Sequence, residues 1–479
     1  EIQVHKDDEV PSIAIIPFRN KGKDEDAFFA YGICADLIAD CSSSGLIRVA
    51  SLEDIEKNEH WDKLKTDELA SMLFVRYIAQ GTLWKMDDMF QLSVELYDTK
   101  DRKVIWLDRW QESWDNLPTI KMNLSDGLLK ALDTQTEEKQ IETNNPKAYE
   151  FYLKGLDIFR GRKNENDFDK SKKLIKDSIH LDDDFYPAKI LLIQIYQTEG
   201  NIADAEKIVK ELIEKSKLNN NNRALARAYY SYSNILRLKA EMFPAIDIQK
   251  KSLKIYKKLK NNIRIIHCYG SLGFYYDMIG NYSESMDYNN KAIEILKELG
   301  DREGIGYYYR RKGNVYSKLG NYDNALKYYN ISIKHIFNNT EHDIEKKNMI
   351  EFDIHQVYSY MGEFDLAINY FFTHYEDAKN RNDALWCVAI FWQISEGYLV
   401  QEKNKNALKY IEKAIAINDN TQLNELSFQL NVIANLSRKR LSIDYSNQRI
   451  KDFLNSSDIV NHPFCRSYRY TYNYFLYEL

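Results

Sequence analysis

Residues 271–296 read SLGFYYDMIGNYSESMDYNNKAIEIL, and residues 311–336 repeat the pattern as RKGNVYSKLGNYDNALKYYNISIKHI. Each segment begins with apolar residues at a helical spacing, is interrupted by Gly-Asn-Tyr, and continues with a second helical spacing. The glycine at the interruption can adopt the left-handed conformation that ends many helices. We therefore expect each segment to form a helical hairpin.

The hairpin pattern extends well beyond these two segments. A small residue recurs at intervals of 40, 40, 40, 42 and 40 residues, at Ala205, Ala245, Ser285, Ala325, Ala367 and Ala407. A tyrosine or leucine stands nine residues before each of them, and a glycine, alanine or glutamate stands five residues before. Small residues let two helix axes approach closely, and the tyrosines can fill the layer between neighbouring hairpins. The period predicts an array of stacked hairpins.

These positions resemble tetratricopeptide repeats (TPRs), most clearly at Leu272-Gly273, Tyr276, Gly280, Tyr282 and Ala292. The resemblance implies an all-α solenoid, a right-handed superhelix of helical hairpins, with about seven repeats over residues 147–420. The usual repeat has ~34 residues, so a 40-residue period implies longer helices, as in kinesin light chains, LGN-like adaptors and bacterial peptide-sensing regulators. In residues 421–479 we expect a degenerate repeat and C-terminal capping helices, and the alternative for the aromatic residues 468–475 is a homodimer contact.

Before the array, residues 11–135 alternate between strand and helix patterns, and residues 1–10 and 136–146 are expected to be linkers. The segments with strand patterns are 12–18, 46–50, 74–83, 90–97 and 104–110, and those with helical patterns are 28–41, 66–73 and 120–132. Asp87-Asp88 and Lys100-Asp101 separate the last three strand segments as hairpin turns. This order predicts a small mixed-sheet α+β domain.

The order and spacing of these elements resemble the TolB-like amino-terminal domain over most of residues 11–135. The positions that carry the resemblance are Ile13–Phe18, Tyr31-Gly32-Ile33, Asp36–Ile38, Val75–Ile78, Gln80–Thr82, Leu92–Asp98 and Val104–Trp106. Leu83-Trp84 and Cys41 depart from the residues that are usual there, without disturbing the strand order. In that family the domain is not known as a catalyst, and it lies between an effector and a helical repeat array. The effectors are class III adenylate/guanylate cyclases of bacteria, winged-helix DNA-binding domains and protein kinases.

Charge and hydropathy argue against two classes of partner. The chain has 66 Lys+Arg against 72 Asp+Glu, a formal net charge of −6, so it lacks the basic excess on which nonspecific nucleic-acid affinity depends. No apolar run approaches the ~20 residues that span a bilayer, and the first ten residues lack the apolar core of a signal peptide. We expect no nucleic-acid binding and no membrane insertion by this segment, and a location in the bacterial cytoplasm. Because the chain begins with Glu1, we also expect further sequence upstream.

Motifs for catalysis, cofactors and metals are not found. The sequence contains no Gly-x-x-x-x-Gly-Lys-Ser/Thr loop, no Gly-x-Gly-x-x-Gly fingerprint and no Gly-x-Ser-x-Gly elbow, so neither a standard phosphate cradle nor a serine nucleophile is indicated. It also contains no His-Glu-x-x-His and no Cys-x-x-Cys zinc motif. His355 and His374 stand at repeat positions that usually hold a small residue, and we expect them to be packed within a looser hairpin. We expect no catalytic residue, no cofactor and no metal in this segment.

The remaining candidate for a functional site is the inner wall of the array, which first helices form in a TPR superhelix. Inward positions lie 18, 15, 11 and 8 residues before each small residue, and they include Gln194, Gln197, Arg227, Asn234, Arg237, Phe274, Asp277, Tyr307, Arg310, Asn314, Gln356, Trp392 and Glu396. Amides and arginines can bond both a peptide backbone and a carboxylate. The alternative is that these side chains only solvate the wall.

Arg310 with Asn314 resembles the first half of the carboxylate clamp of chaperone-binding arrays. Asp353, Ala389 and Gln393 stand where the remaining clamp amides and cations would be needed, which disfavours a chaperone C-terminus as the ligand. The sequence thus favours a sensory or scaffold module that binds a peptide or protein in its groove and regulates an attached or associated effector, foremost a bacterial nucleotide cyclase. The alternatives are the sensory half of a winged-helix transcription regulator and a stand-alone TPR adaptor.

Overall fold

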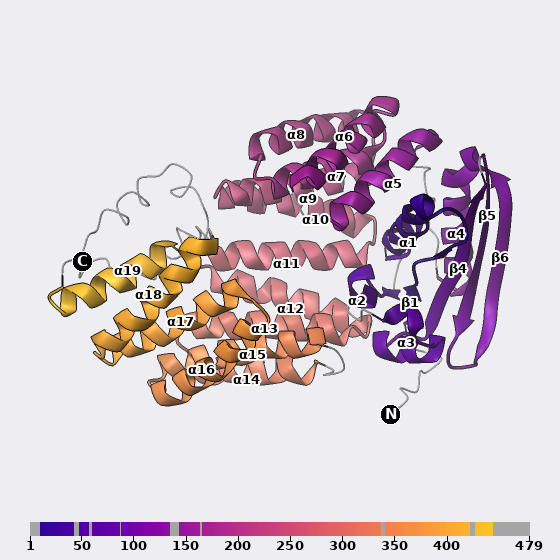
Figure 1. Ribbon diagram of the computed structural model, residues 1–479. Helices are drawn as coiled ribbons and strands as arrows, with labels where there is room; N and C mark the ends of the chain where they lie inside the picture. The colour runs from indigo at the N-terminus through magenta and orange to yellow at the C-terminus, as the bar shows by residue number, and fades with distance from the viewer. Residues whose placement is uncertain are drawn as a thin grey trace.

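The chain folds into a small α/β domain followed by a long row of helices that curves beside it (Figure 1). The computed structural model describes residues 10–42, 47–56, 60–86, 88–134, 143–162, 165–336, 341–421 and 427–443. The fold class is the predicted one, a mixed-sheet domain and a TPR-like helical solenoid.

The α/β domain contains one mixed sheet with the strand order β3-β1-β4-β5-β6. Its strands are β1 (Ser12–Ile15), β2 (Arg19–Asn20), β3 (Arg48–Val49), β4 (Tyr77–Met86), β5 (Met89–Asp98) and β6 (Lys103–Ser113). β1 is parallel to both β3 and β4, whereas β4, β5 and β6 form an antiparallel meander. The two-residue strand β2 also pairs with β4, and it is too short to leave a pattern in the sequence.

Helices pack against the sheet from two sides. They are α1 (Ala27–Ser42), α2 (Leu52–Glu56), α3 (Thr66–Leu73) and α4 (Leu117–Ala131). Ile13 and Ile15 of β1 belong to the core that includes α1 and α4, whereas Ala14 and Ile16 belong to the core that includes α2 and α3. β1 is therefore buried on both faces, and this explains why its sequence is continuously apolar rather than alternating.

Within the described residues, the helices from α5 to α18 pair into seven hairpins, and α19 (Ser427–Arg440) follows them. The hairpins are α5 (Pro146–Arg160) with α6 (Glu165–Leu181), α7 (Tyr186–Thr198) with α8 (Ile202–Leu218), α9 (Asn222–Leu238) with α10 (Met242–Lys258), α11 (Asn262–Met278) with α12 (Tyr282–Glu298), α13 (Arg302–Lys318) with α14 (Tyr322–Lys334), α15 (Glu341–Tyr360) with α16 (Phe364–Asn380), and α17 (Ala384–Val400) with α18 (Asn404–Thr421).

The turn inside each hairpin from α7 onwards has the predicted left-handed conformation. Gly280 and Gly320 have φ angles of 77° and 70°, in the left-handed region that costs glycine little. The asparagine that follows each glycine caps the next helix, because the Asn281 side chain accepts a hydrogen bond from the backbone N–H of Glu284. Ala240 and Glu402 occupy the same turn position with φ angles of 59° and 57°, so the backbone keeps its shape where the glycine is missing.

The repeated small residues and tyrosines bring the helices into close contact. A Cβ atom on Gly273 would lie 3.0 Å from Oδ1 of Asn289 in the second helix of the same hairpin. Tyr276 stacks on Tyr288 with ring centroids 5.7 Å apart, and the Lys250 ammonium of the preceding hairpin lies 5.6 Å from the Tyr276 ring centroid. Tyr276 thus fills the layer between two hairpins, as its repeat position predicts.

The α/β domain contacts the array at two places. In the first, α1 packs against α5 (Figure 1), where Leu153 lies directly over Gly32, and a single core cluster continues from the sheet to α9. In the second, Val10 packs against the core formed by α9 to α13, and the charges of Arg48 and Asp301 attract each other. The first hairpins and the α/β domain therefore share one continuous hydrophobic core.

Several expectations fall outside the described residues. Residues 1–9 and 135–142 cover most of the two expected linkers, and the chain after residue 443 contains the aromatic residues 468–475 that we considered as a cap or a dimer contact. α19 is the part of the expected C-terminal helices that the structure describes.

Candidate functional site: the first-helix wall

The first helices of neighbouring hairpins lie side by side. α7 contacts both α5 and α9, α13 contacts α15, and α17 contacts α19, although a second helix separates each of these pairs along the chain. Side-chain contacts join α9 to α11, α11 to α13 and α15 to α17 as well. Helices α7, α9, α11, α13, α15 and α17 therefore form a continuous surface, which we call the first-helix wall. It is the surface on which the predicted ligand-binding residues are located.

Hydrogen bonds link successive first helices along this wall. The Tyr275 hydroxyl of α11 donates to Oδ1 of Asn234 on α9 over 3.0 Å. On the next helix, the Tyr308 hydroxyl donates to the backbone oxygen of Ile266 over 3.0 Å. Because both tyrosines are almost fully buried, these bonds fix the spacing of the hairpins as well as satisfying the hydroxyl groups.

Asp277, Arg310 and Asn314 are all engaged within the chain. Asp277 pairs with Lys318 of α13 over 2.6 Å, and Asn314 accepts a 2.7 Å hydrogen bond from the Tyr329 hydroxyl. Arg310 donates through Nε to Oδ2 of Asp353 on α15 over 2.6 Å. The half clamp that the sequence indicates at Arg310 is thus already occupied by a carboxylate of the next first helix.

Other predicted residues remain accessible. Gln194 is exposed on α7, and Gln197 donates a long 3.5 Å hydrogen bond to the backbone oxygen of Ser231. Tyr307 on α13 is 55% exposed. Phe274 of α11, half-buried, meets Tyr275 edge-on with centroids 6.3 Å apart.

The wall changes character towards the C-terminus. Gln356 is half-buried on α15, and Trp392 of α17 packs against the last core cluster. Burial raises the pKa of Glu396 to about 7. Gln194 and Trp392 therefore lie at opposite ends of the wall and do not form one cluster, whereas Asn234, Asp277 and Arg310 each contact a neighbouring first helix.

Two basic residues, Arg264 near the start of α11 and Arg311 within α13, were missed by the sequence reasoning. Arg264 stands one helical turn before the inward position of His267, and Arg311 is adjacent to Arg310. Arg311 donates through Nη1 to the backbone oxygen of Gly270 over 2.7 Å. Desolvation and then the nearby charge of Arg227 lower the pKa of Arg264. Extending the inward spacing by one turn towards each helix N-terminus would have found Arg264.

His355 and His374 pack within their hairpin, as expected. The His355 ring stacks on Tyr370 with a centroid distance of 3.7 Å, and the His374 ring packs against Tyr370 at 4.0 Å with a tilt of 37°. Desolvation lowers the pKa of each histidine, although Glu351 opposes the shift at both. These side chains replace the small residues of other repeats with a three-ring stack.

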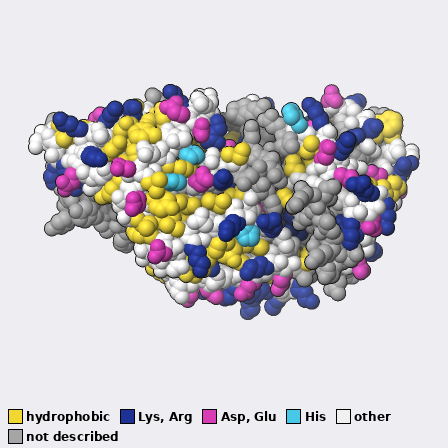
Figure 2. Space-filling view, turned by 90° about the horizontal axis from the view of Figure 1, so that it is seen from below, with side chains coloured by type: hydrophobic (Ala, Val, Ile, Leu, Met, Phe, Trp, Pro, Cys, Tyr) yellow, Lys and Arg dark blue, Asp and Glu magenta, His cyan; other side chains and the backbone are white. Residues whose placement is uncertain are grey.

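Figure 2 shows that hydrophobic side chains gather on the part of the array that lies far from the α/β domain. The exposed apolar residues of that part include Leu319, Tyr360, Met361 and Leu366. Tyr360, Met361 and Leu366 belong to the same hairpin, α15 with α16, as His355 and His374.

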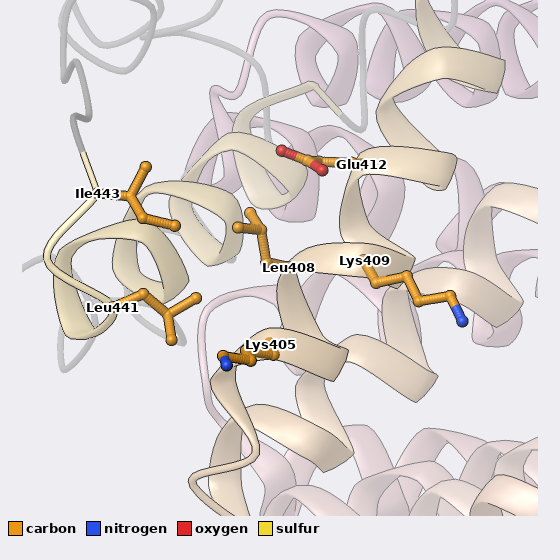
Figure 3. A pocket seen from close by; sticks show the side chains of 6 residues that line it. All are labelled: Lys405, Leu408, Lys409, Glu412, Leu441 and Ile443. Atoms are coloured by element: carbon orange, nitrogen blue, oxygen red, sulfur yellow. The ribbon is translucent and has the colours of Figure 1, made fainter.

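Two depressions lie away from the wall. One, of about 510 Å³, lies where the chain leaves β1 and is lined by residues that include Arg19, Tyr31, Trp61 and Asp157. The other, of about 370 Å³, lies between α18 and the end of α19, where Leu408, Leu441 and Ile443 line the same space (Figure 3).

Neither a metal centre nor a membrane span is found in the part of the chain that the structure describes. There, no three His, Cys, Asp or Glu side chains are grouped so that they could hold a metal ion. No helix in the same residues is both long and apolar enough to cross a bilayer.

Comparison with known proteins identifies similar helical arrangements only. No protein-family model and no curated protein matches the chain. Among solved structures, aspartyl phosphate phosphatase F from Bacillus subtilis is 14% identical, with 72% of this chain and 93% of that chain covered and a TM-score of 0.49. A Rap protein complexed with competence and sporulation factor is also 14% identical, with 71% and 95% covered and a TM-score of 0.43.

A third similar structure is the signal transduction ATPase with numerous domains (STAND) protein with a tetratricopeptide repeat sensor from Pyrococcus horikoshii. It is 14% identical, with 76% of this chain covered and a TM-score of 0.46, and the chain spans 60% of its length. At these identities the similarity concerns the backbone arrangement alone.

Proposed function

We propose that the chain is a non-catalytic sensory or scaffold module whose first-helix wall binds a peptide or protein partner. The supporting observation is the wall itself, which presents amide, aromatic and arginine side chains from consecutive hairpins to solvent. Gln194 and Tyr307 are exposed on it. Side chains of this kind can bond a peptide backbone and cover its apolar groups at the same time.

The packing between the two parts supports a regulatory role. A single core cluster includes the sheet, α1, α5 and the helices as far as α9. A partner that changes the spacing of the first hairpins would therefore act on the α/β domain through packed side chains. We propose that the domain passes this change to an attached or associated effector.

For the effector we propose a bacterial nucleotide cyclase, because the α/β domain resembles the TolB-like domain that accompanies such enzymes. Strands β1, β4, β5 and β6 and helix α1 contain most of the residues on which that resemblance rests. A winged-helix transcription regulator and a stand-alone adaptor remain the alternatives, and the effector found with the chain in its source cells separates the three.

Photocrosslinking tests the wall directly. Benzoylphenylalanine in place of Tyr307 would lie on the first-helix wall, and the same group in place of Lys251 would lie exposed on α10, a second helix of the same array. We expect a discrete crosslinked partner in source cells from position 307 and none from position 251. Equal adducts at both positions, or none at position 307, would contradict the proposal.

The complex recovered from those cells tests the effector. Formation of a cyclic nucleotide by the complex supports the cyclase, and retention of a specific DNA fragment supports the winged-helix alternative. A complex with neither activity leaves the stand-alone adaptor.

A further inference from the structure

We infer that the depression at the end of β1 binds a small organic cation, which carries an ammonium or guanidinium group on an apolar frame. We call this place the β1 depression, and its lining includes Arg19, Asp24, Phe28, Tyr31, Trp61 and Asp157. It lies away from the first-helix wall, so the inference does not depend on the proposed function.

The topology of the sheet explains why a depression forms here. β1 is parallel to both β3 and β4. Helix α1, which follows β1, packs on one face of β1, whereas α2 and α3, which follow β3, pack on the other. Where the chain leaves neighbouring parallel strands towards opposite faces, a crevice opens outside their carboxyl ends, and α/β sheets bind ligands there.

The position and size of the β1 depression fit such a crevice. Residues 17–20 follow β1 directly and line it. Its volume of about 510 Å³ is within the range of roughly 300 to 1,000 Å³ that is usual for small-molecule sites.

Aromatic side chains from both faces of the sheet form the walls. Phe28 and Tyr31 belong to α1, and Trp61 belongs to the 3₁₀ helix η2 (Trp61–Lys63) between α2 and α3. Phe28 packs against the core that includes α1 and α4, whereas Tyr31 and Trp61 pack against the core that includes α2 and α3. All three side chains are half-buried. A ligand therefore meets ring surfaces that packing has already ordered, which lowers the entropy lost on binding.

Contacts from α5 show that two of these rings attract cations. The Lys154 ammonium lies 5.8 Å from the ring centroid of Phe28, and the Arg160 guanidinium lies 5.6 Å from that of Tyr31. Tryptophan attracts cations more strongly than either of these rings. Among the described residues, no Lys or Arg lies over the Trp61 ring, so this ring is open to a cation from outside the chain.

Acidic side chains outnumber basic ones along the lining. Asp24 and Glu25 precede α1, and Asp157 comes from α5, whereas Arg19 is the one basic side chain among the lining residues that the structure describes. Glu25 lies 3.7 Å from the Lys23 ammonium. Within the described part of the chain, Asp24 and Asp157 have no ion-pair partner. A cation in the β1 depression would therefore find two carboxylates that the chain does not pair itself.

The start of α1 argues against a phosphate or another anion as the ligand. Doubly wound sheets hold phosphate groups at the N-terminus of the helix that follows the first strand, where a glycine-rich turn lets the backbone N–H groups approach. Here Asp24-Glu25-Asp26 precedes the helix, and Asp26 pairs with Lys85 of β4 over 3.4 Å. Carboxylates at this position repel an anion and attract a cation.

The ligand would contact both parts of the chain. Asp157 belongs to the array, whereas the other lining residues belong to the α/β domain. α5 packs against α1 beside the depression. Because a ligand stabilises the arrangement to which it binds, a bound cation would strengthen the contact between the domain and the array.

Isothermal titration calorimetry of the full chain with three matched probes tests the inference. The probes are 2-phenylethylammonium, neutral 2-phenylethanol and the anion 3-phenylpropionate, which share an aromatic group and differ in charge. We expect saturable binding of the ammonium probe and at least about tenfold weaker binding of the other two. Only the cation gains from the carboxylates and from the face of the Trp61 ring.

Two variants with matched controls locate the probe. Asp157→Asn removes a carboxylate and Trp61→Leu removes the open ring, and each should weaken binding of the ammonium probe by about tenfold. The controls are Asp108→Asn and Trp84→Leu, which change an exposed carboxylate and an exposed tryptophan of the same domain outside the depression. We expect changes below about twofold for the controls. Circular dichroism confirms that each variant is folded.

Amide hydrogen exchange tests the contact with both parts. Exchange should slow in both α1 and α5 when the ammonium probe is bound, and slowing in α1 alone would overturn the bridging role of the ligand.

Other outcomes overturn the site itself. These are equal affinity for the three probes, preference for the anion, absence of saturable binding, or equal losses for Asp157→Asn and Asp108→Asn. None of them alters the crosslinking expected at position 307, so the cation site and the proposed function fail separately.

Discussion

The hydroxyl of Tyr149 on α5 donates a 2.7 Å hydrogen bond to Oδ2 of Asp36 on α1, and so connects the array to the α/β domain. Lys121 of α4 lies 3.4 Å from the same carboxylate and 3.4 Å from Asp40. Tyr149, Asp36 and Lys121 are each less than 10% exposed. The two parts of the chain thus meet around a buried polar network rather than around apolar contacts alone, and such networks specify one arrangement of the parts that they join.

Tyr149→Phe should destabilise the chain by about 1 to 3 kcal/mol, because it removes the nearer of the two donors, Tyr149 and Lys121, from a buried carboxylate oxygen of Asp36. The free energy of unfolding in urea measures the loss. Tyr196→Phe is the matched control, since Tyr196 is also buried on a first helix. We expect the control to change stability by less than about 0.5 kcal/mol. Equal losses for both variants would show that the Asp36 contact has no special role.

The turn positions predict a stabilising substitution. Glu402 is exposed and has a φ angle of 57°, where Gly280 and Gly320 stand in other hairpins. Glu402→Gly should raise the free energy of unfolding by roughly 1 kcal/mol, and Gly280→Ala should lower it by a similar amount, because only glycine adopts this conformation without steric cost. Thermal unfolding of the two variants should therefore shift in opposite directions, and a shift in the same direction would contradict this reasoning.

The close approach of helices within a hairpin predicts a pair of opposite effects. A Cβ atom on Gly313 would lie 2.5 Å from the ring of Tyr329, whereas a Cβ on Gly397 would lie 3.6 Å from the nearest atom of Ile368. Gly313→Ala should therefore destabilise by about 1 to 3 kcal/mol through overpacking. Gly397→Ala should stabilise by up to about 1 kcal/mol through helix propensity. Chemical denaturation of the two variants checks both signs.

The stack of His355, Tyr370 and His374 predicts a pH dependence. Desolvation lowers the pKa of both histidines below the ordinary value of 6.5. Above pH 6.5 both forms of the chain hold these rings neutral, whereas below it the unfolded chain takes up protons before the folded chain does. Stability is therefore complete above pH 6.5 and is lost as the pH falls towards the lowered pKa values.

Urea unfolding at about pH 7.5 and about pH 5.5 measures this loss. The charged groups that act on the two rings are Glu351, Asp377 and Arg381, and they are kept in every variant. His355→Gln with His374→Gln should flatten the pH dependence between these values. An unchanged dependence would assign the effect to groups elsewhere in the chain.

Most secondary structure could be predicted from the sequence, since it depends on local patterns. The helix predicted over 66–73 is observed at Thr66–Leu73, and the strand predicted over 90–97 is observed as Met89–Asp98. The missed elements are β2 and α2, which are two and five residues long. Elements this short are stabilised by contacts with other parts of the fold, so the pattern of apolar residues in the sequence does not predict them.

The site could be predicted only in outline. The spacing correctly assigns residues such as Asn234 and Tyr307 to first helices. It does not tell which of these side chains are already bonded within the chain and which can contact a partner. Asp277 and Arg310 turn out to be paired with charges from other helices, and their roles in binding stay predictions. Arg264 was missed because its place depends on how far along each helix the wall extends.

The sequence by itself determined the hairpins, their period and the conformation of their turns, because helix spacing, glycine at φ above zero and asparagine caps act between residues a few positions apart. Only the tertiary structure decided which arginine of the wall is satisfied. Arg310 and Asp353 are 43 residues apart in the chain and meet because two first helices lie side by side. Contact between adjacent hairpins therefore determines which charges meet, and the helical spacing within one segment does not encode it.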